Sequence, residues 1–182
     1  MMSSFFRLMP VLTDDTMTID LKSHEDFSFT MGLRFDKNFK PPVKFKVSNK
    51  SGIKTWPTLF LPEPVFHLKF LEHLRQAGVS NIDDYPLSFS GIKNNKKQET
   101  HYRAVNIIGN VSCADLKRSK FEEFDGMYFF DNLIIDEKKA KGKMFFRVAE
   151  GAEYIVLSKT LVERLDLSIF PDVMLAPLQS LN

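Results

Sequence analysis

The run His-Tyr-Arg-Ala-Val-Asn-Ile-Ile-Gly-Asn-Val-Ser-Cys, residues 101–113, decides the fold expected for this chain. It is the most strand-like segment, because it is rich in β-branched and apolar residues, which suit a pleated, half-buried backbone. Gly109 lies inside the run and predicts a bulge or a bend. Asp115 follows and predicts a cap for a short helical turn through Lys120. We therefore expect a bent strand that ends in a turn.

Strands and a hairpin are predicted downstream of this run. Apolar residues that alternate or cluster predict strands at 128–136, 144–148, 154–157 and 173–176. The first two, joined by the charged turn Glu137 to Lys143, predict a β-hairpin. Thr160 and Glu163 are spaced as in a capping box and predict a short helix. Pro177 is expected to lie just after the last strand.

The best helix of the protein is predicted upstream, from about Glu63 to Ala77. Phe66, Phe70 and Leu74 form one apolar stripe at helical spacing, and Gly78 supplies a stop. Alternation also predicts strands at residues 27–29, 43–47 and 87–91. Two polar stretches predict a turn and a surface loop, at residues 48–52 and 93–99.

The order of these elements is strands, helix, strands, helix, strand. Because βα units do not alternate regularly, the fold class expected is mixed α+β, with a mainly antiparallel sheet, one main helix and one or two short helices. The 182 residues fit a single domain, within which residues 1–60 could form a β-rich subdomain and residues 61–180 an α+β core. The 18 phenylalanines are expected to fill that core.

Charge is distributed unevenly along the chain. The net charge is only +2, so nucleic-acid binding is disfavoured. Residues 34–54 are nevertheless basic, which indicates either a solvated edge strand or an anion-binding patch. The candidate binding residues in this segment are Arg34, Lys37, Lys44 and Lys46.

Acidic residues gather at two other places. Asp83-Asp84 and Glu122-Glu123 with Asp125 are typical of solvated turns, but together they could form an acidic face for a basic partner. We take Asp83, Asp84, Glu122, Glu123 and Asp125 as candidate partner-binding residues.

No pattern of residues predicts catalysis, a metal or a cofactor. His67 and His73 are six residues apart on the predicted helix, which does not place two ligands on one face. Cys113 is the only cysteine, so no intramolecular disulfide forms, and in an extended strand it lies roughly 40 Å from His101. An enzyme that uses His67, His101 or Glu72 in a cleft is a weaker hypothesis. No leader peptide or membrane span is recognised, so we expect a cytoplasmic protein.

An ordered set of motifs resembles a known family. Residues 102–119 resemble the conserved centre of family eleven of the polymorphic-toxin immunity proteins, formerly a domain of unknown function. Further motifs match in the same order, at residues 70–79, 84–86, 133–136, 144–147, 154–158 and 161–165. The resemblance spans about residues 55–176, and the basic N-terminal third takes no part in it.

The resemblance implies a cytoplasmic, non-enzymatic protein that binds and neutralises a cognate secreted bacterial toxin by stoichiometric protein–protein interaction. The alternative function is a nucleic-acid or polyanion-binding module that uses the basic segment 34–54. A partner protein, a polyanion and a small-molecule substrate thus stand as three classes of ligand to distinguish.

Overall fold

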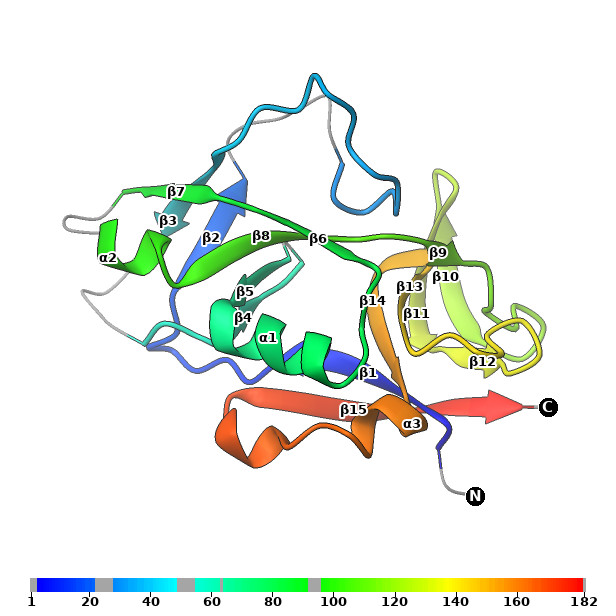
Figure 1. The fold of residues 1–182 in the computed structure, drawn as a ribbon. Coiled ribbons are helices and arrows are strands. Elements are labelled where there is room, and N and C mark those ends of the chain that lie inside the picture. Colours follow the sequence, from blue (N-terminus) through cyan, green and yellow to red (C-terminus); the bar gives the residue numbers. More distant parts are fainter. Residues whose placement is uncertain (1–2, 22–27, 49–54, 63, 92–95, 182) are drawn as a thin grey trace.

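The computed structural model describes residues 3–21, 28–48, 55–62, 64–91 and 96–181. Strands hold 46% of these described residues and helices 12%, so the mixed α+β class is confirmed in outline, with more sheet than helix. Figure 1 shows the strands arranged in separate sheets around helix α1 (Leu68–Gln76).

The largest sheet has six strands, and it brings both ends of the chain together. Its order is β12 (Ile134–Asp136), β15 (Val173–Leu181), β1 (Phe5–Pro10), β14 (Gly151–Ser158), β13 (Phe145–Val148) and β9 (Asn110–Val111). Strand β1 is antiparallel to both neighbours, β14 and β15. Strands from both sides of residue 60, where the sequence suggested a boundary between a subdomain and the core, thus share one sheet.

Two smaller sheets and a separate hairpin complete the strands. The four-stranded sheet is ordered β4 (Leu59–Phe60), β5 (Val65–His67), β8 (Tyr102–Ile107) and β6 (Ile82–Tyr85). The three-stranded sheet is ordered β2 (Thr18–Leu21), β3 (Val43–Ser48) and β7 (Leu87–Ser90). The hairpin consists of β10 (Lys120–Phe124) and β11 (Met127–Asn132). Most strand pairs are antiparallel, whereas β3–β7, β9–β13 and β12–β15 are parallel.

Short helical segments lie near the ends of strands. They are α2 (Lys96–Glu99), α3 (Lys159–Val162) and the 3-10 turn η1 (Leu167–Ile169). No helix in the described part of the chain has the length and apolar character needed to cross a membrane.

Three clusters of buried apolar side chains pack between the sheets and against their faces. The largest lies around α1 and joins Phe70 and Leu74 to Leu8 and Ile155 of the six-stranded sheet and to Val105 of β8. A second cluster fills the space between the three-stranded and four-stranded sheets, and a third covers the other face of the six-stranded sheet. Several strands are therefore buried on both faces, which explains their almost continuous apolar sequences.

The run 101–113 joins two of these sheets. Its first part is β8 of the four-stranded sheet, and its last part includes β9 of the six-stranded sheet. Gly109 between them has φ +95°, a left-handed conformation that glycine adopts without steric cost. The predicted bend is thus confirmed, and it is the point where the chain leaves one sheet for another.

The predicted helix start and hairpin are wrong. Residues 65–67 form strand β5, because they pair with β8, and the helix begins at Leu68. The segment 127–136 is split into β11 and β12, and neither pairs with β13. Instead β13 pairs with β14, and β11 pairs with the missed strand β10.

Several local predictions also need correction. Phe29 lies in a turn, while Phe27 and most of the predicted turn 48–52 fall outside the described residues. Asp115 accepts a hydrogen bond from the backbone of Lys117, but the segment is a turn and not a helix. Helix α3 is capped by Ser158 rather than Thr160. Strand β15 continues through Pro177. Proline has no backbone N–H to donate to a neighbouring strand. None is needed on the β12 side at this position, because β12 pairs with β15 only from Gln179 onward.

Candidate functional site: an acidic and apolar hairpin

The hairpin β10–β11 turns at Asp125 and Gly126. Both residues have positive φ, +51° and +75°. This is the backbone of the tight two-residue turn that matches the twist of paired strands, for which Asp-Gly is a preferred sequence. The Asp-Gly pair was therefore the signal in the sequence that could have revealed this hairpin.

One face of the hairpin is fixed to the large sheet. The rings of Phe121, Tyr128 and Phe130 contact one another, with Phe121 and Phe130 centroids 5.7 Å apart. The Tyr154 hydroxyl of β14 donates a 3.0 Å hydrogen bond to the Phe130 carbonyl. A Cβ atom on Gly151 would lie 3.2 Å from the Phe130 ring, so the missing side chain lets the ring approach β14 closely. The hairpin is thus held in one place.

The opposite face of the hairpin exposes large apolar side chains. Phe124 is 70% exposed, Met127 54% and Phe129 52%. Phe124 lies directly opposite Met127, and Phe129 lies opposite Glu122, so alternation puts these residues on one face. We call Phe124, Met127 and Phe129 the hairpin trio. Large apolar groups gathered in this way on a rigid element are typical of interaction sites.

The hairpin also carries acidic side chains: Glu122 shares the face of the hairpin trio, Asp125 is at the turn, and Glu123, opposite Tyr128, is on the other face. Glu122, Glu123 and Asp125 are all exposed, and none makes an ion pair within the described ranges. The nearby Asp131, by contrast, is paired with Lys120 at 2.8 Å. Three of the five acidic candidates are thus together on one element and free to meet cations.

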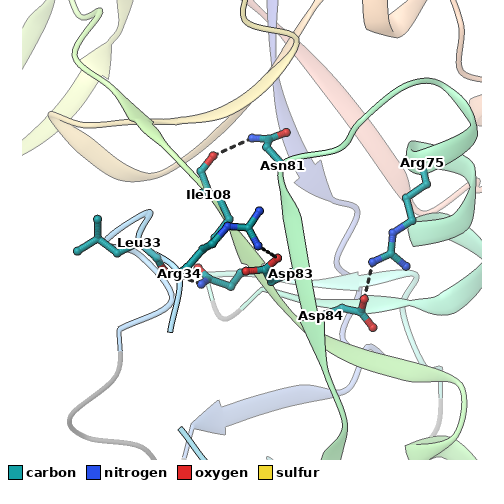
Figure 2. Close-up of polar contacts among 8 residues, drawn as sticks. Leu33, Arg34, Arg75, Asn81, Asp83, Asp84 and Ile108 are labelled. Atoms are coloured by element: carbon teal, nitrogen blue, oxygen red, sulfur yellow. Dashed lines mark hydrogen bonds and ion pairs between the residues drawn. The ribbon is translucent and has the colours of Figure 1, made fainter. Parts of the chain in front are cut away.

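The other two acidic candidates are neutralised within the molecule. The Asp83 carboxylate accepts a hydrogen bond of 2.6 Å from the Arg34 guanidinium. The Asp84 carboxylate forms ion pairs with Arg75 and, at 3.4 Å, with Arg103. Figure 2 shows Arg34 and Arg75 approaching strand β6 from different parts of the chain. Asp83 and Asp84 therefore tie the segment around residue 34 and helix α1 to this strand.

The basic candidates are spread over different elements. Arg34 is occupied by Asp83, and Lys37 is exposed in a turn. Lys44 and Lys46 are exposed on the outward face of β3, whose Val43, Phe45 and Val47 point into the second cluster. The predicted alternation of β3 is thus confirmed, and its two lysines point to solvent.

A loop near Arg34 is clamped by the bent run. Buried Asn106 donates from its amide to the Leu33 carbonyl at 2.8 Å, and Asn110 donates to the Thr30 carbonyl at 2.9 Å. The Gly109 backbone donates to the Gly32 carbonyl at 2.8 Å. Figure 2 shows the Leu33 side chain pointing away from this anchor. The polar residues of the central run therefore position a loop; their role could not be read from alternation.

The residues considered for catalysis lie in different environments. Cys113 is fully buried, and burial raises the pKa of its thiol to about 12, with a further contribution from Glu150. A thiol in this state is a poor nucleophile at neutral pH. His67 and His101 stack with ring centroids 5.8 Å apart, while Glu72 is exposed on α1. Among the described residues, no group of three or more His, Cys, Asp or Glu side chains could hold a metal ion.

Similarity to other proteins gives no further guide to the site. No protein-family model matches the chain, and no curated protein matches it. The case for a function consequently depends on the motifs in the sequence and on the surfaces described above.

Proposed function

We propose that this protein binds a partner protein stoichiometrically through the outer face of the β10–β11 hairpin, and so neutralises it. The observation that carries the proposal is the hairpin trio, three exposed apolar side chains on a ribbon whose other face is anchored to β14. Apolar and aromatic anchors with a polar rim are the usual arrangement of energetically important interface residues.

The acidic rim defines the chemistry of the partner. Glu122 beside the hairpin trio and Asp125 at the turn, with Glu123 adding charge from the other face, favour a partner whose contact surface is cationic around an apolar centre. The ordered resemblance to polymorphic-toxin immunity proteins makes the finer proposal specific: the partner is a cognate secreted bacterial toxin. In that reading the hairpin covers the toxin's functional surface in the cytoplasm, and no catalysis by this chain is required.

The test has two steps. First, a partner is captured with the immobilised chain and identified, and its affinity is measured for the parent and for a variant with Phe124→Ser and Phe129→Ser. Loss of two interface anchors costs on the order of 2 kcal/mol each, so we expect an affinity at least about 100-fold weaker. A matched control, Val11→Ser with Leu12→Ser, removes two other exposed apolar side chains and should leave the affinity unchanged.

The second step tests neutralisation. The captured partner is expressed in cells with the parent chain, the hairpin variant or the control variant. Growth should be rescued by the parent and the control but not by the hairpin variant. Equal binding by all three chains would exclude the hairpin as the interface, and failure of the parent to rescue growth would exclude the immunity function.

The rim can be tested separately from the trio. Glu122→Gln, Glu123→Gln and Asp125→Asn remove the charges while keeping the shapes, and asparagine tolerates the left-handed conformation of residue 125. We expect slower association and a weaker dependence of the association rate on salt, because rim charges mainly steer the encounter. An unchanged salt dependence would contradict a cationic partner surface.

A further inference from the structure

A polar cavity lies beside the bend of the central run, away from the hairpin trio. Its volume is about 450 Å³, within the range of small-molecule sites. Its walls come from residues 78–81 after α1, from the bend 108–112, and from the turn that precedes β13. Side chains added at Gly109 or Gly142 would meet nothing within 4 Å, so the walls are open at both glycines.

The turn before β13 is built rigidly. The carboxylate of Asp136 accepts from the backbone of Lys138 at 3.0 Å and of Lys139 at 3.3 Å. Ala140 is fully buried in the third apolar cluster, and its backbone is bonded to both Asp136 and Lys143. The backbone that carries the exposed residues around Ala140 is therefore held in place.

This turn carries a concentrated positive charge. Lys138, Lys139, Lys141 and Lys143 are all exposed, and none forms an ion pair within the described segments. Lys139 and Lys143 line the cavity, whose walls include no acidic residue. The carboxylate of Glu150, two residues after β13, is occupied by the Ser112 hydroxyl at 2.5 Å and by two backbone N–H groups.

We propose that this cavity binds a compact phosphate-bearing small molecule. Lys139 and Lys143 would supply the cationic donors, and the Ser80 hydroxyl in the same wall would supply a neutral one. Lysine ammonium groups bind phosphate as point charges, and a multiply charged anion relieves the repulsion between neighbouring lysines. This ligand is additional to the partner protein, and the site does not depend on the hairpin.

Pyrophosphate is the probe that tests this site. Its binding is measured by calorimetry at constant ionic strength, with sodium chloride as the balancing salt. The parent should bind one pyrophosphate per chain, and Lys139→Ala with Lys143→Ala should weaken binding about tenfold or more. The arginine pair, Lys139→Arg with Lys143→Arg, should largely retain it, because the charge remains.

Two controls make the result decisive. Lys44→Ala with Lys46→Ala removes the same net charge from the outward face of β3 and should leave pyrophosphate affinity unchanged. The hairpin variant should also bind pyrophosphate normally, which separates this site from the proposed function. Equal weakening by both lysine-to-alanine pairs, absence of binding at millimolar pyrophosphate, or binding of an oligonucleotide that pyrophosphate cannot displace would each overturn the proposal.

Discussion

His67 caps helix α1 with a ring nitrogen. Its Nδ1 accepts a hydrogen bond of 3.2 Å from the backbone of Lys69, so this nitrogen must be unprotonated. Burial of the ring, and then the positive charge of the neighbouring His101, lower the pKa of His67 below its ordinary value of 6.5. The capping of the start of helix α1 thus depends on the protonation state of one side chain, and therefore on pH.

The folded protein should become less stable as this histidine is protonated. Because the pKa of His67 is lower in the folded state than in the unfolded chain, its contribution to stability is present above pH 6.5 and is lost as pH falls through the lowered value. His67→Asn keeps a good capping residue and removes the titration. Urea unfolding from pH 8 to about pH 5 should show a smaller loss of stability for this variant than for the parent; parallel curves would contradict the assignment.

Asn106 and Asn110 show why polar residues stand in a strand-like run. Tyr102 and Ala104 belong to the second apolar cluster, and Val105 and Ile107 to the cluster around α1, so both sides of β8 are apolar. The amides of the two asparagines instead bond to the carbonyls of Leu33 and Thr30, which are more than seventy residues away. Such partners depend on how the chain folds back, and no local pattern reports them.

At the scale of elements, the loop that includes Gly32 depends on close contact with β9. Gly32 has φ +68°, and a Cβ atom there would lie 2.5 Å from the side-chain oxygen of Asn110. Gly126 in the hairpin turn has a similar φ of +75° but open space around it. Comparing substitutions at these two glycines therefore distinguishes the energetic cost of the left-handed backbone conformation from the additional cost of a steric clash.

Alanine at these two positions should have unequal effects. Gly126→Ala should lower the free energy of unfolding by about 1–2 kcal/mol, the cost of a left-handed conformation for a residue with a side chain. Gly32→Ala should cost more, because it adds a clash with Asn110 that displaces the loop. Denaturant unfolding of both variants measures the difference. Equal losses in the free energy of unfolding would show that the loop accommodates the added methyl group at no extra cost.

The pairing of strands was the part of the element scale that the sequence predicted least well. Tyr128–Asp136 and Met144–Val148 have the alternation of a hairpin, but β13 pairs with β14. Residues 65–67 continue the apolar stripe of the helix, yet pair with β8 as a strand. In both cases long-range pairing overrode a local signal, because backbone groups of these segments are satisfied by strands distant in sequence.

For the whole molecule, the N-terminal strand completes the largest sheet. Strand β1 lies between β14 and β15, and Leu8 on it is fully buried in the cluster around α1. The first residues of the described chain therefore contribute to the same core as the main helix.

Removing the Leu8 side chain should destabilise the entire protein. Leu8→Ala should lower the free energy of unfolding by about 2–5 kcal/mol, because it leaves a cavity between the helix and the sheet. Leu12→Ala, at a position that is 58% exposed, should change it by less than about 0.5 kcal/mol. Thermal unfolding followed by circular dichroism compares the two, and similar melting temperatures would show that β1 is not part of the core.

By itself the sequence determined the class of fold, the bend at Gly109 and the acidic character of Glu122, Glu123 and Asp125, because these follow from composition, local conformation and charge. Only the tertiary structure decided which charges are free. It pairs Asp83 with Arg34 and Asp84 with Arg75, and it leaves the hairpin acids beside three exposed apolar side chains. The physical reason is that ion pairing and burial depend on neighbours in space, which the folding of distant segments brings together.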